Sequence, residues 1–375
     1  MNGHNKRIIL AAGGSGGHIF PAIALASELE KKNAGEICFI SSKRRLDRDI
    51  LKETGYRCFF LSINPMPLKF APVRVITFFL KLAMDTVASF CIIVSLRPDA
   101  VVGFGGYSSG AIARAAKIFG IPLLIHEQNL VPGRANRILC RAADKIAVSF
   151  KGSEEQFSCD KEKVIFSGNP LRTGSLSRDR EASARALGVS PEKFTILVMG
   201  GSQGASFLNR TVSEAARRIA RDKDLRVQFI HLTGKKDLQS VSAFYSENGI
   251  PGRVFSFLEK IEDAYAASDM AISRAGAAAV FELAYYAKPM ILVPYPNPKN
   301  NQRSNAEYFA DKGAAICREE KDLTPESLYD DILNMMERED ERERLSKAAG
   351  ALSVPDAAEV LAGEVMKLVE NRDKG

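Results

Sequence analysis

A glycine cluster near the N-terminus is the first segment whose composition could serve a reaction. The sequence LAAGGSGGHIFP, residues 10–21, holds four glycines around Ser15 and continues into His18. Glycines between a strand and a helix let backbone N–H groups approach an anion, and the helix dipole adds partial positive charge there. The spacing differs from the G-x-G-x-x-G dinucleotide motif, and the lysine of the nucleotide-triphosphatase loop is missing. We therefore expect a phosphate-binding turn, with tight strand–helix packing as the alternative.

Three further segments place small residues directly after an apolar run. VVGFGGYSSG starts at Val101, GGSQG follows the run TILVM from Thr195, and AGAAA at residues 275–279 precedes a helical segment that carries Glu282. TILVMGGSQG also resembles IILAAGGSGG from Ile8, which indicates a weak internal repeat across the two halves of the chain. Two anion-binding turns in the first half suggest a diphosphate. Glu282 could bind ribose hydroxyls or lie in solvent on a helix surface.

Four consecutive polar residues end another apolar run in the first half. The run LLI leads into His126, Glu127, Gln128 and Asn129. Ligands of doubly wound folds bind at the carboxyl ends of the strands, so these side chains could face a substrate. They could equally cap the loop that follows.

Short apolar runs alternate with helical patterns along the chain, as in parallel βαβ units. We expect strands at 7–12, 37–41, 99–104, 122–126, 145–148, 194–199, 226–232, 253–257, 270–273 and 289–294, and helices at 21–31 and 111–119. The fold class is thus α/β, with two doubly wound Rossmann-like domains facing a cleft. We divide the chain into an N-terminal domain at 1–166, a C-terminal domain at 167–350, and a C-terminal helix at 351–375 that packs back toward the N-terminal domain.

The composition excludes several classes of protein. Of 375 residues, 46% are apolar and 26% are charged, which is typical of a globular chain and not of a disordered or fibrous one. The six cysteines have no paired short spacing, so we expect neither a disulfide framework nor a metal cluster. The formal net charge is +7, but no basic stripe carries interleaved aromatic residues, so we expect no nucleic-acid partner. The N-terminal apolar run is too short for a signal peptide, which favours a cytoplasmic protein.

Seven motifs in order resemble the MurG family, the bacterial glycosyltransferases that add N-acetylglucosamine to lipid I. The resemblance extends from about residue 7 to residue 355 and rests on GGSGGHIFPAIALA, GFGGYSSG, HEQN, GNPLR, GGSQGA, RAGAAAVFE and NNQRSNA. It implies a GT-B fold whose C-terminal domain binds the donor UDP-N-acetylglucosamine. The N-terminal domain would then bind the acceptor and the membrane.

The resemblance implies a set of donor-binding residues. They are Arg172, Ser202, Leu258, Ala277, Ala278, Ala279, Val280, Phe281, Glu282, Asn301 and Gln302, together with Ser15, Gly16, Gly17 and Asn129 of the N-terminal half. Glu282 would bind the ribose and Gln302 the sugar. Asn301 stands where the family often has glutamine, and Ala279 where it often has threonine, so backbone amides would have to hold the phosphates at Ala279.

The resemblance also implies an acceptor site and a division of chemical roles. The acceptor diphosphate would lie against Gly14, Ser15, Gly16, Gly17, Gly105, Gly106 and Tyr107. An inverting transfer needs a base for the acceptor's 4-hydroxyl. Histidine titrates near neutral pH, so His18 is the first candidate and Glu127 the second. No Asp-x-Asp segment ends a strand, so we expect metal-independent chemistry without a cofactor.

The most apolar segment of the chain runs from Lys69 to Arg97. We predict an amphipathic helix here and not a membrane span, because Lys81 and Asp85 would be costly near the bilayer centre. The predicted core face is Ile76, Leu80, Ala83, Val87, Phe90 and Val94. A second stripe of Val75, Phe78, Phe79 and Leu82, bordered by Lys69, Arg74 and Lys81, would dock on an anionic membrane surface.

Two rivals to the glycosyltransferase reading remain: a UDP-sugar epimerase of the same fold, and a non-catalytic nucleotide-sugar sensor. An epimerase would need neither the apolar stripe nor the second glycine loop, and a sensor would tolerate the loss of a base at His18. The expected partners are therefore UDP-N-acetylglucosamine, lipid I, the cytoplasmic face of the plasma membrane and other proteins of cell-wall synthesis.

Overall fold

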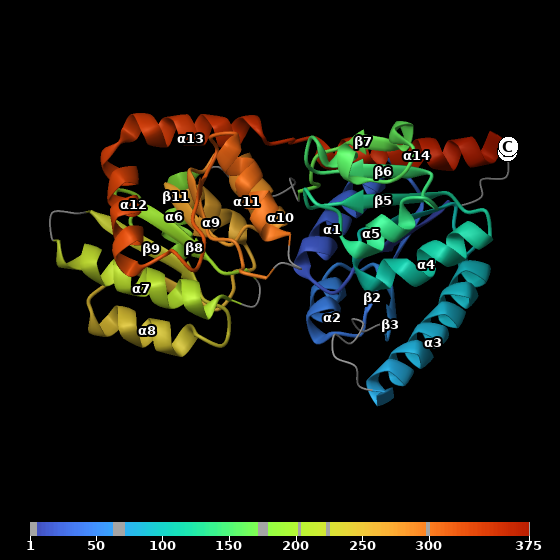
Figure 1. Ribbon diagram of the computed structural model, residues 1–375, viewed down its shortest axis with the longest axis horizontal. Helices are drawn as coiled ribbons and strands as arrows, with labels where there is room; N and C mark the ends of the chain where they lie inside the picture. Colours follow the sequence, from blue (N-terminus) through green and yellow to red (C-terminus); the bar gives the residue numbers. More distant parts are fainter. Residues whose placement is uncertain are drawn as a thin grey trace. The chain divides into compact units, whose positions relative to one another are not determined.

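The computed structural model describes residues 6–62, 72–171, 179–201, 204–222, 226–297 and 301–374. Its contacts divide the chain into two units, of which unit 1 comprises residues 1–172 and 354–375 and unit 2 comprises residues 173–353. Each is a parallel α/β unit (Figure 1). The prediction of two doubly wound α/β domains is therefore confirmed.

Unit 1 contains a parallel sheet in the order β3-β2-β1-β4-β5-β6-β7. Its elements are β1 (Arg7–Ala11), α1 (Gly16–Lys31), β2 (Glu36–Ser42), α2 (Arg45–Lys52), β3 (Arg57–Leu61), α3 (Pro72–Leu96), β4 (Ala100–Gly103), α4 (Gly106–Ile118), β5 (Leu123–Glu127), α5 (Arg134–Leu139), β6 (Lys145–Val148), 3₁₀ turns at Ser153–Gln156 and Lys161–Lys163, β7 (Val164–Phe166) and α14 (Ala357–Lys374). Strands β1 and β4 are neighbours, so the glycine loops that follow them leave the same edge of the sheet.

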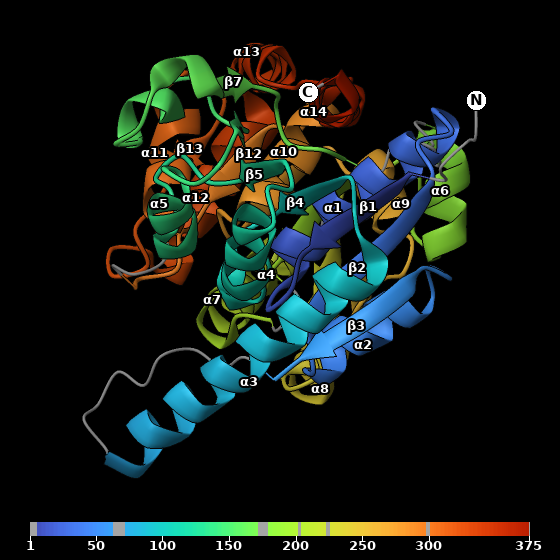
Figure 2. The same ribbon diagram turned by 90° about the vertical axis from the view of Figure 1, so that its right-hand side faces the viewer.

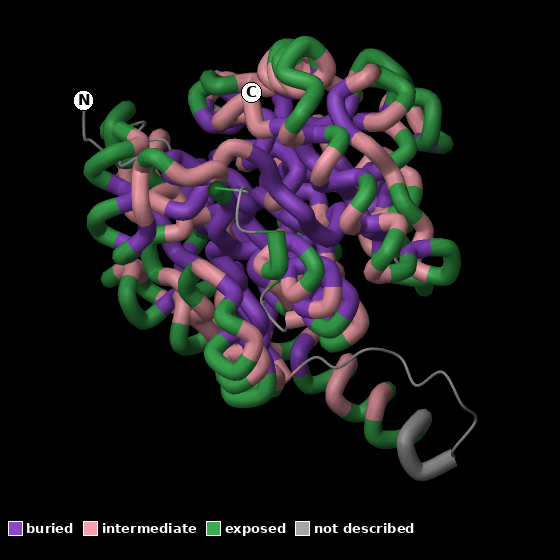
Figure 3. The backbone as a smooth tube through the Cα atoms, turned by 90° about the vertical axis from the view of Figure 1, so that its left-hand side faces the viewer, coloured by how far each residue is buried: buried purple, intermediate pink, exposed green. Residues whose placement is uncertain are grey.

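Both faces of this sheet are buried, which explains the continuous apolar runs of the sequence. Along β1, Ile9 and Ala11 pack into one core cluster, whereas Ile8 and Leu10 pack into another. The second cluster also includes Leu361 and Val365 of α14, the helix that brings the end of the chain back to unit 1 beside α1. Figure 3 colours the backbone by burial: buried residues, in purple, lie mostly inside, and exposed residues, in green, lie mostly outside.

Unit 2 contains a parallel sheet in the order β10-β9-β8-β11-β12-β13. Its elements are α6 (Arg180–Leu187), β8 (Phe194–Met199), α7 (Ser206–Arg221), β9 (Val227–Leu232), α8 (Leu238–Glu247), β10 (Gly252–Phe255), α9 (Ile261–Ala267), β11 (Met270–Ser273), α10 (Ala277–Tyr285), β12 (Met290–Leu292), α11 (Gln302–Asp311), β13 (Ile316–Cys317), α12 (Pro325–Glu337) and α13 (Glu339–Ala351). Strands β8 and β11 are neighbours, so the loop after β8 and the N-terminus of α10 lie at the same sheet edge.

Helix α3 packs on the opposite side from the one predicted, so the predicted core face is wrong. Ile76, Leu80 and Val87 are 60%, 62% and 64% exposed, Ala83 and Val94 are also exposed, and Phe90 is only half-buried. The buried side carries Asp85, Ser89, Ile93 and Leu96. Asp85 accepts the N–H of Ser62 at 2.8 Å, and Ile93 and Leu96 join the core cluster. The hydrogen bond of Asp85 thus determines which side of α3 faces the core, since both sides of the helix are apolar.

Helix α3 extends away from the sheet of unit 1 (Figure 2), and its exposed side carries large apolar residues. We call Ile76, Phe79, Leu80, Met84, Val87 and Val94 the α3 apolar face; each is at least half exposed. Of the predicted docking stripe, Phe79 belongs to this face, while Phe78, Lys81 and Leu82 are half-buried. Lys69 and the side chains of Arg74 and Val75 lie outside the described residues. Within the part of the chain that the structure describes, residues 76–96 form the one helix that by length and composition could cross a membrane.

Candidate functional site

The first glycine loop of unit 1 is held from behind by helix α2. The N–H of Gly14 donates to Asp47 Oδ2 at 2.7 Å, and Arg44 donates to the Gly14 carbonyl at 3.0 Å. A Cβ at Gly13 would lie 2.7 Å from Ser41 Oγ, so no larger residue fits there without movement. Because Asp47 takes the Gly14 amide, the amides available to an anion are those at Ser15, Gly16 and Gly17, where α1 begins.

His18 and both glycine loops of unit 1 come together at one point. His18 Nδ1 lies 3.1 Å from the Gly13 carbonyl oxygen and 3.3 Å from Ser15 Oγ. Gly105 and Gly106 both have positive φ angles. A Cβ at Gly105 would lie 3.5 Å from His18 Nε2, and one at Gly106 would lie 2.9 Å from the Gly13 carbonyl. The two glycine loops of unit 1 therefore lie against each other beside His18. The side chain of Tyr107 lies outside the described residues.

The contacts of His18 define which ring nitrogen can accept a proton. A carbonyl oxygen can only accept a hydrogen bond, so the contact with Gly13 places the proton of a neutral ring on Nδ1. Nε2 then carries the lone pair beside the Gly105 backbone. The ring is half-buried and fixed at the N-terminal turn of α1.

Glu127 is buried and its carboxylate accepts hydrogen bonds from four donors. Oε1 accepts from the backbone N–H of Asn129 at 2.9 Å and from its Nδ2 at 3.1 Å. Oε2 accepts from the N–H of Gly133 and from Asn136 Nδ2, both at 2.9 Å. This carboxylate closes the loop from β5 to α5 and orients Asn129. Asn136, which sequence reasoning missed, also donates to the His126 carbonyl.

His126 and Gln128 belong to the interior of unit 1 and not to its surface. His126 Nε2 lies 3.2 Å from the Gly168 carbonyl, and Gln128 Nε2 lies 2.9 Å from His126 Nδ1. Burial lowers the pKa of His126 to about 4, although the bond to Gly168 opposes the shift. The ring is neutral at physiological pH and acts as a structural link. The loop-capping alternative thus fits His126, Glu127 and Gln128, whereas Asn129 is half-exposed.

In unit 2, the small residues before α10 form a turn whose backbone is tightly held. Gly276 precedes the helix, which begins at Ala277. Asn305 donates to the Ala275 carbonyl at 3.1 Å, and Arg274 donates to the carbonyls of Val293 and Pro294. Arg274 also pairs with Glu320 at 2.6 Å, both largely buried. The first-turn amides of α10 have no acceptor within the helix, so this end can receive an anion.

The predicted donor residues of unit 2 divide into those that face outward and those that serve the core. Val280 and Phe281 are buried, and the Phe281 ring contacts Phe309 at 5.7 Å. Ala278 and Ala279 are half-buried, as are Leu258 in the loop after β10 and Asn301 and Gln302 at the start of α11. Gln302 Oε1 accepts the N–H of Tyr295 at 3.0 Å. Arg172 and Ser202 lie outside the described residues.

Glu282 lies in the second turn of α10 and is half-buried. The hydroxyl of Tyr265, from α9, donates to Glu282 Oε2 at 2.6 Å. Glu282 stands out in the sequence but Tyr265 does not, because nothing local connects positions 17 residues apart.

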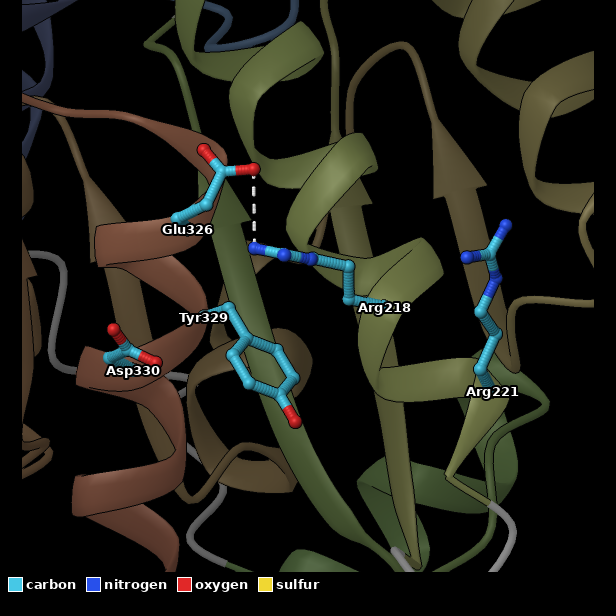
Figure 4. A pocket seen from close by; sticks show the side chains of 5 residues that line it. All are labelled: Arg218, Arg221, Glu326, Tyr329 and Asp330. Atoms are coloured by element: carbon cyan, nitrogen blue, oxygen red, sulfur yellow. Dashed lines mark ion pairs between the residues drawn. The ribbon is translucent and has the colours of Figure 1, made fainter.

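A surface pocket of about 470 Å³ lies elsewhere in unit 2, between α7 and α12 (Figure 4). Arg218, Arg221, Glu326, Tyr329 and Asp330 line it. Arg218 pairs with Glu326 at 3.2 Å and lies over the Tyr329 ring. None of these residues belongs to the predicted site. Elsewhere among the residues that the structure describes, no group of three or more His, Cys, Asp or Glu side chains is placed to hold a metal ion.

Comparison with known proteins gives full-length matches. Residues 8–148 match the glycosyltransferase family 28 N-terminal domain, and residues 195–361 match the glycosyltransferase family 28 C-terminal domain. A protein of Desulfotalea psychrophila named UDP-N-acetylglucosamine–N-acetylmuramyl-(pentapeptide) pyrophosphoryl-undecaprenol N-acetylglucosamine transferase is 37% identical over 98% of both chains. A protein of the same name from Halalkalibacterium halodurans is 35% identical over 95% of this chain and 97% of its own.

Solved structures agree with this assignment. The crystal structure of MurG from Acinetobacter baumannii superposes with a TM-score of 0.75 at 27% identity, over 96% of this chain and 99% of that one. UDP-GlcNAc 2-epimerase from Neisseria meningitidis has a TM-score of 0.70 at 12% identity over 96% of this chain and all of its own, which shows the shared fold alone. The predicted family resemblance is therefore confirmed: the chain belongs to glycosyltransferase family 28 and, within it, to the UDP-N-acetylglucosamine–N-acetylmuramyl-(pentapeptide) pyrophosphoryl-undecaprenol N-acetylglucosamine transferases.

Proposed function

We propose that this chain transfers N-acetylglucosamine from UDP-N-acetylglucosamine to the 4-hydroxyl of the N-acetylmuramyl-pentapeptide of lipid I, with His18 as the base. The observation that carries the assignment of roles is the convergence of two glycine loops on His18 in unit 1. Family membership supports the reaction, and this convergence supports the place of the acceptor. The epimerase alternative rests on likeness of fold alone.

The acceptor's diphosphate binds the amides at Ser15, Gly16 and Gly17. Helix α1 adds the partial positive charge of its N-terminus. Gly105 and Gly106 contribute backbone without side chains, so a bulky diphosphate can approach. The acceptor hydroxyl then lies within reach of His18 Nε2.

The reaction is an inverting displacement at the anomeric carbon of the donor sugar. His18 Nε2 takes the proton of the 4-hydroxyl while its oxygen bonds to the anomeric carbon, and the bond from that carbon to the UDP oxygen breaks. UDP leaves with the electron pair of that bond. General-base catalysis of this kind contributes about 10²- to 10⁴-fold in rate.

In unit 2, the N-terminus of α10 receives the donor diphosphate and the charge that develops on UDP. Glu282 accepts hydrogen bonds from the ribose hydroxyls, and Gln302 contacts the sugar. Backbone amides and the helix dipole stabilise a leaving diphosphate without a metal ion. We therefore propose metal-independent transfer.

The α3 apolar face docks unit 1 on the cytoplasmic surface of the membrane. The face is exposed, whereas the opposite side of α3 is bound to unit 1 through Asp85, Ile93 and Leu96. A helix held in this way lies on a membrane surface instead of crossing it. Docking brings the glycine loops to an acceptor whose lipid tail stays in the bilayer.

The test of this function is the transfer reaction with the full chain. Incubation with UDP-N-acetylglucosamine and lipid I should release UDP and form a disaccharide lipid in equal amounts. UDP-glucose serves as the control donor and should react far more slowly. Interconversion of UDP-N-acetylglucosamine with its 2-epimer, without transfer, would overturn the proposal in favour of the epimerase.

A further inference from the structure

Tyr265 and Glu282 form a short hydrogen bond between two helices that flank strand β11. The phenol oxygen lies 2.6 Å from Glu282 Oε2. A hydroxyl that donates to a carboxylate at this distance makes a charge-assisted bond, roughly twice as strong as a bond between neutral groups. Glu282 is half-buried in the second turn of α10, whereas Tyr265 is only 3% exposed.

The surroundings of Tyr265 hold its hydroxyl in place. Its ring packs on Tyr286 with centroids 5.4 Å apart. Its backbone carbonyl accepts the hydroxyl of Ser268 at 3.1 Å, and the Ser268 carbonyl accepts Lys288 Nζ at 2.5 Å. The phenol therefore acts as a fixed donor, while the carboxylate it contacts ends a flexible side chain.

We propose that Tyr265 is a positioning residue that orients the Glu282 carboxylate toward the ribose hydroxyls of the donor nucleotide. This inference rests on the proposed role of Glu282 as the ribose ligand. A glutamate side chain in solvent samples several rotamers, and ordering it on binding costs affinity. The bond from Tyr265 removes that cost because it holds the carboxylate in one orientation before UDP arrives. Tyr265 touches neither reacting atom, so its loss should raise KM for the donor and leave kcat unchanged.

The test compares Tyr265→Phe with Glu282→Gln and with the control Tyr286→Phe, which removes a phenol from the same aromatic cluster. UDP and 2′,3′-dideoxy-UDP are titrated calorimetrically into each full-length variant, and Tm is recorded. We expect Tyr265→Phe to weaken UDP binding about tenfold, equivalent to ~1.4 kcal/mol. Binding of the dideoxy nucleotide, which has no ribose hydroxyls, should be the same as in the unaltered protein. Tyr286→Phe should change neither affinity.

The outcomes separate this inference from the proposed function. If Glu282→Gln leaves the preference for UDP over the dideoxy nucleotide intact, Glu282 is not the ribose ligand and the proposed donor site fails. If Glu282→Gln abolishes that preference but Tyr265→Phe retains it, only the positioning role fails. An equal loss of affinity for both nucleotides in Tyr265→Phe, with a lowered Tm, would show a purely structural tyrosine and overturn the inference.

Discussion

Replacing Glu127 by glutamine distinguishes a structural carboxylate from a catalytic one. In the structure each carboxylate oxygen accepts two donors, from Asn129 on one side and from Gly133 and Asn136 on the other. Glu127→Gln turns one acceptor oxygen into an NH₂ group, which leaves two partly or fully buried donor hydrogens without an acceptor. At about 1–3 kcal/mol for each unsatisfied group, unit 1 should lose roughly 2–6 kcal/mol of stability.

Two quantities are measured for the variant: its stability, by urea denaturation, and its kcat in the absence of urea. We expect the urea concentration at the unfolding midpoint of unit 1 to fall markedly. The folded fraction of the variant should still transfer sugar at a rate within a few-fold of normal. The control Glu155→Gln changes an exposed glutamate and should alter stability by no more than about 0.5 kcal/mol. Unchanged stability together with a 10²- to 10⁴-fold loss of kcat would refute the reasoning and make Glu127 the base.

Three further predictions concern the membrane, pH and metal. The double variant Leu80→Ser with Val87→Ser should bind anionic vesicles ~2–4 kcal/mol more weakly, because each exposed side chain contributes about 1–2 kcal/mol. Its activity on a water-soluble acceptor should persist. Unaltered sedimentation with the vesicles would contradict docking. Burial lowers the pKa of His126 to about 4 and that of His231 to about 3. The free energy of unfolding should therefore be highest above pH 6.5 and should fall by ~2 kcal/mol for each histidine between pH 7 and pH 5. An equal denaturation midpoint at both pH values would contradict this prediction. Transfer should continue in excess EDTA, and loss of turnover that magnesium restores would disprove metal-independent chemistry.

The sheets could be predicted from the sequence because their central strands are buried on both faces. The runs at β1, β6, β8 and β11 agree with the structure within a residue or so. The missed strands β3, β7 and β13 lie at sheet edges, where they are short or partly exposed and carry weaker apolar signals. Helices α1 and α4 begin inside the glycine clusters, earlier than predicted, because their N-terminal turns are formed by glycines with little helix preference.

The rotation of α3 could not be read from its sequence. Apolar residues occur on both sides of this helix, so periodicity gives two equivalent core faces. The choice depends on Asp85, which reaches the Ser62 amide across 23 residues. An anchoring carboxylate looks the same in the sequence as a solvated one.

The loops of the site were predictable, but the residues that hold them were not. Gly13 and Gly106 meet because β1 and β4 are adjacent, which is the strand arrangement expected of parallel βαβ units. Asp47 bonds to Gly14, which is 33 residues away in the sequence, and Asn136 bonds to Glu127, which is 9 residues away. Tyr265 bonds to Glu282, which is 17 residues away. No local pattern marks such partners. Asp47 could have been found only by asking which polar residue is buried beside the first glycine loop.

The catalytic role of His18 is the central claim, and one comparison tests it most directly. The transfer rate of His18→Ala is measured with UDP-N-acetylglucosamine and lipid I at saturation, and UDP affinity is measured on the same preparation. We expect kcat to fall by about 10²- to 10⁴-fold, while the Kd for UDP should stay unchanged because its proposed site lies in unit 2. A near-normal kcat with intact UDP binding would contradict it.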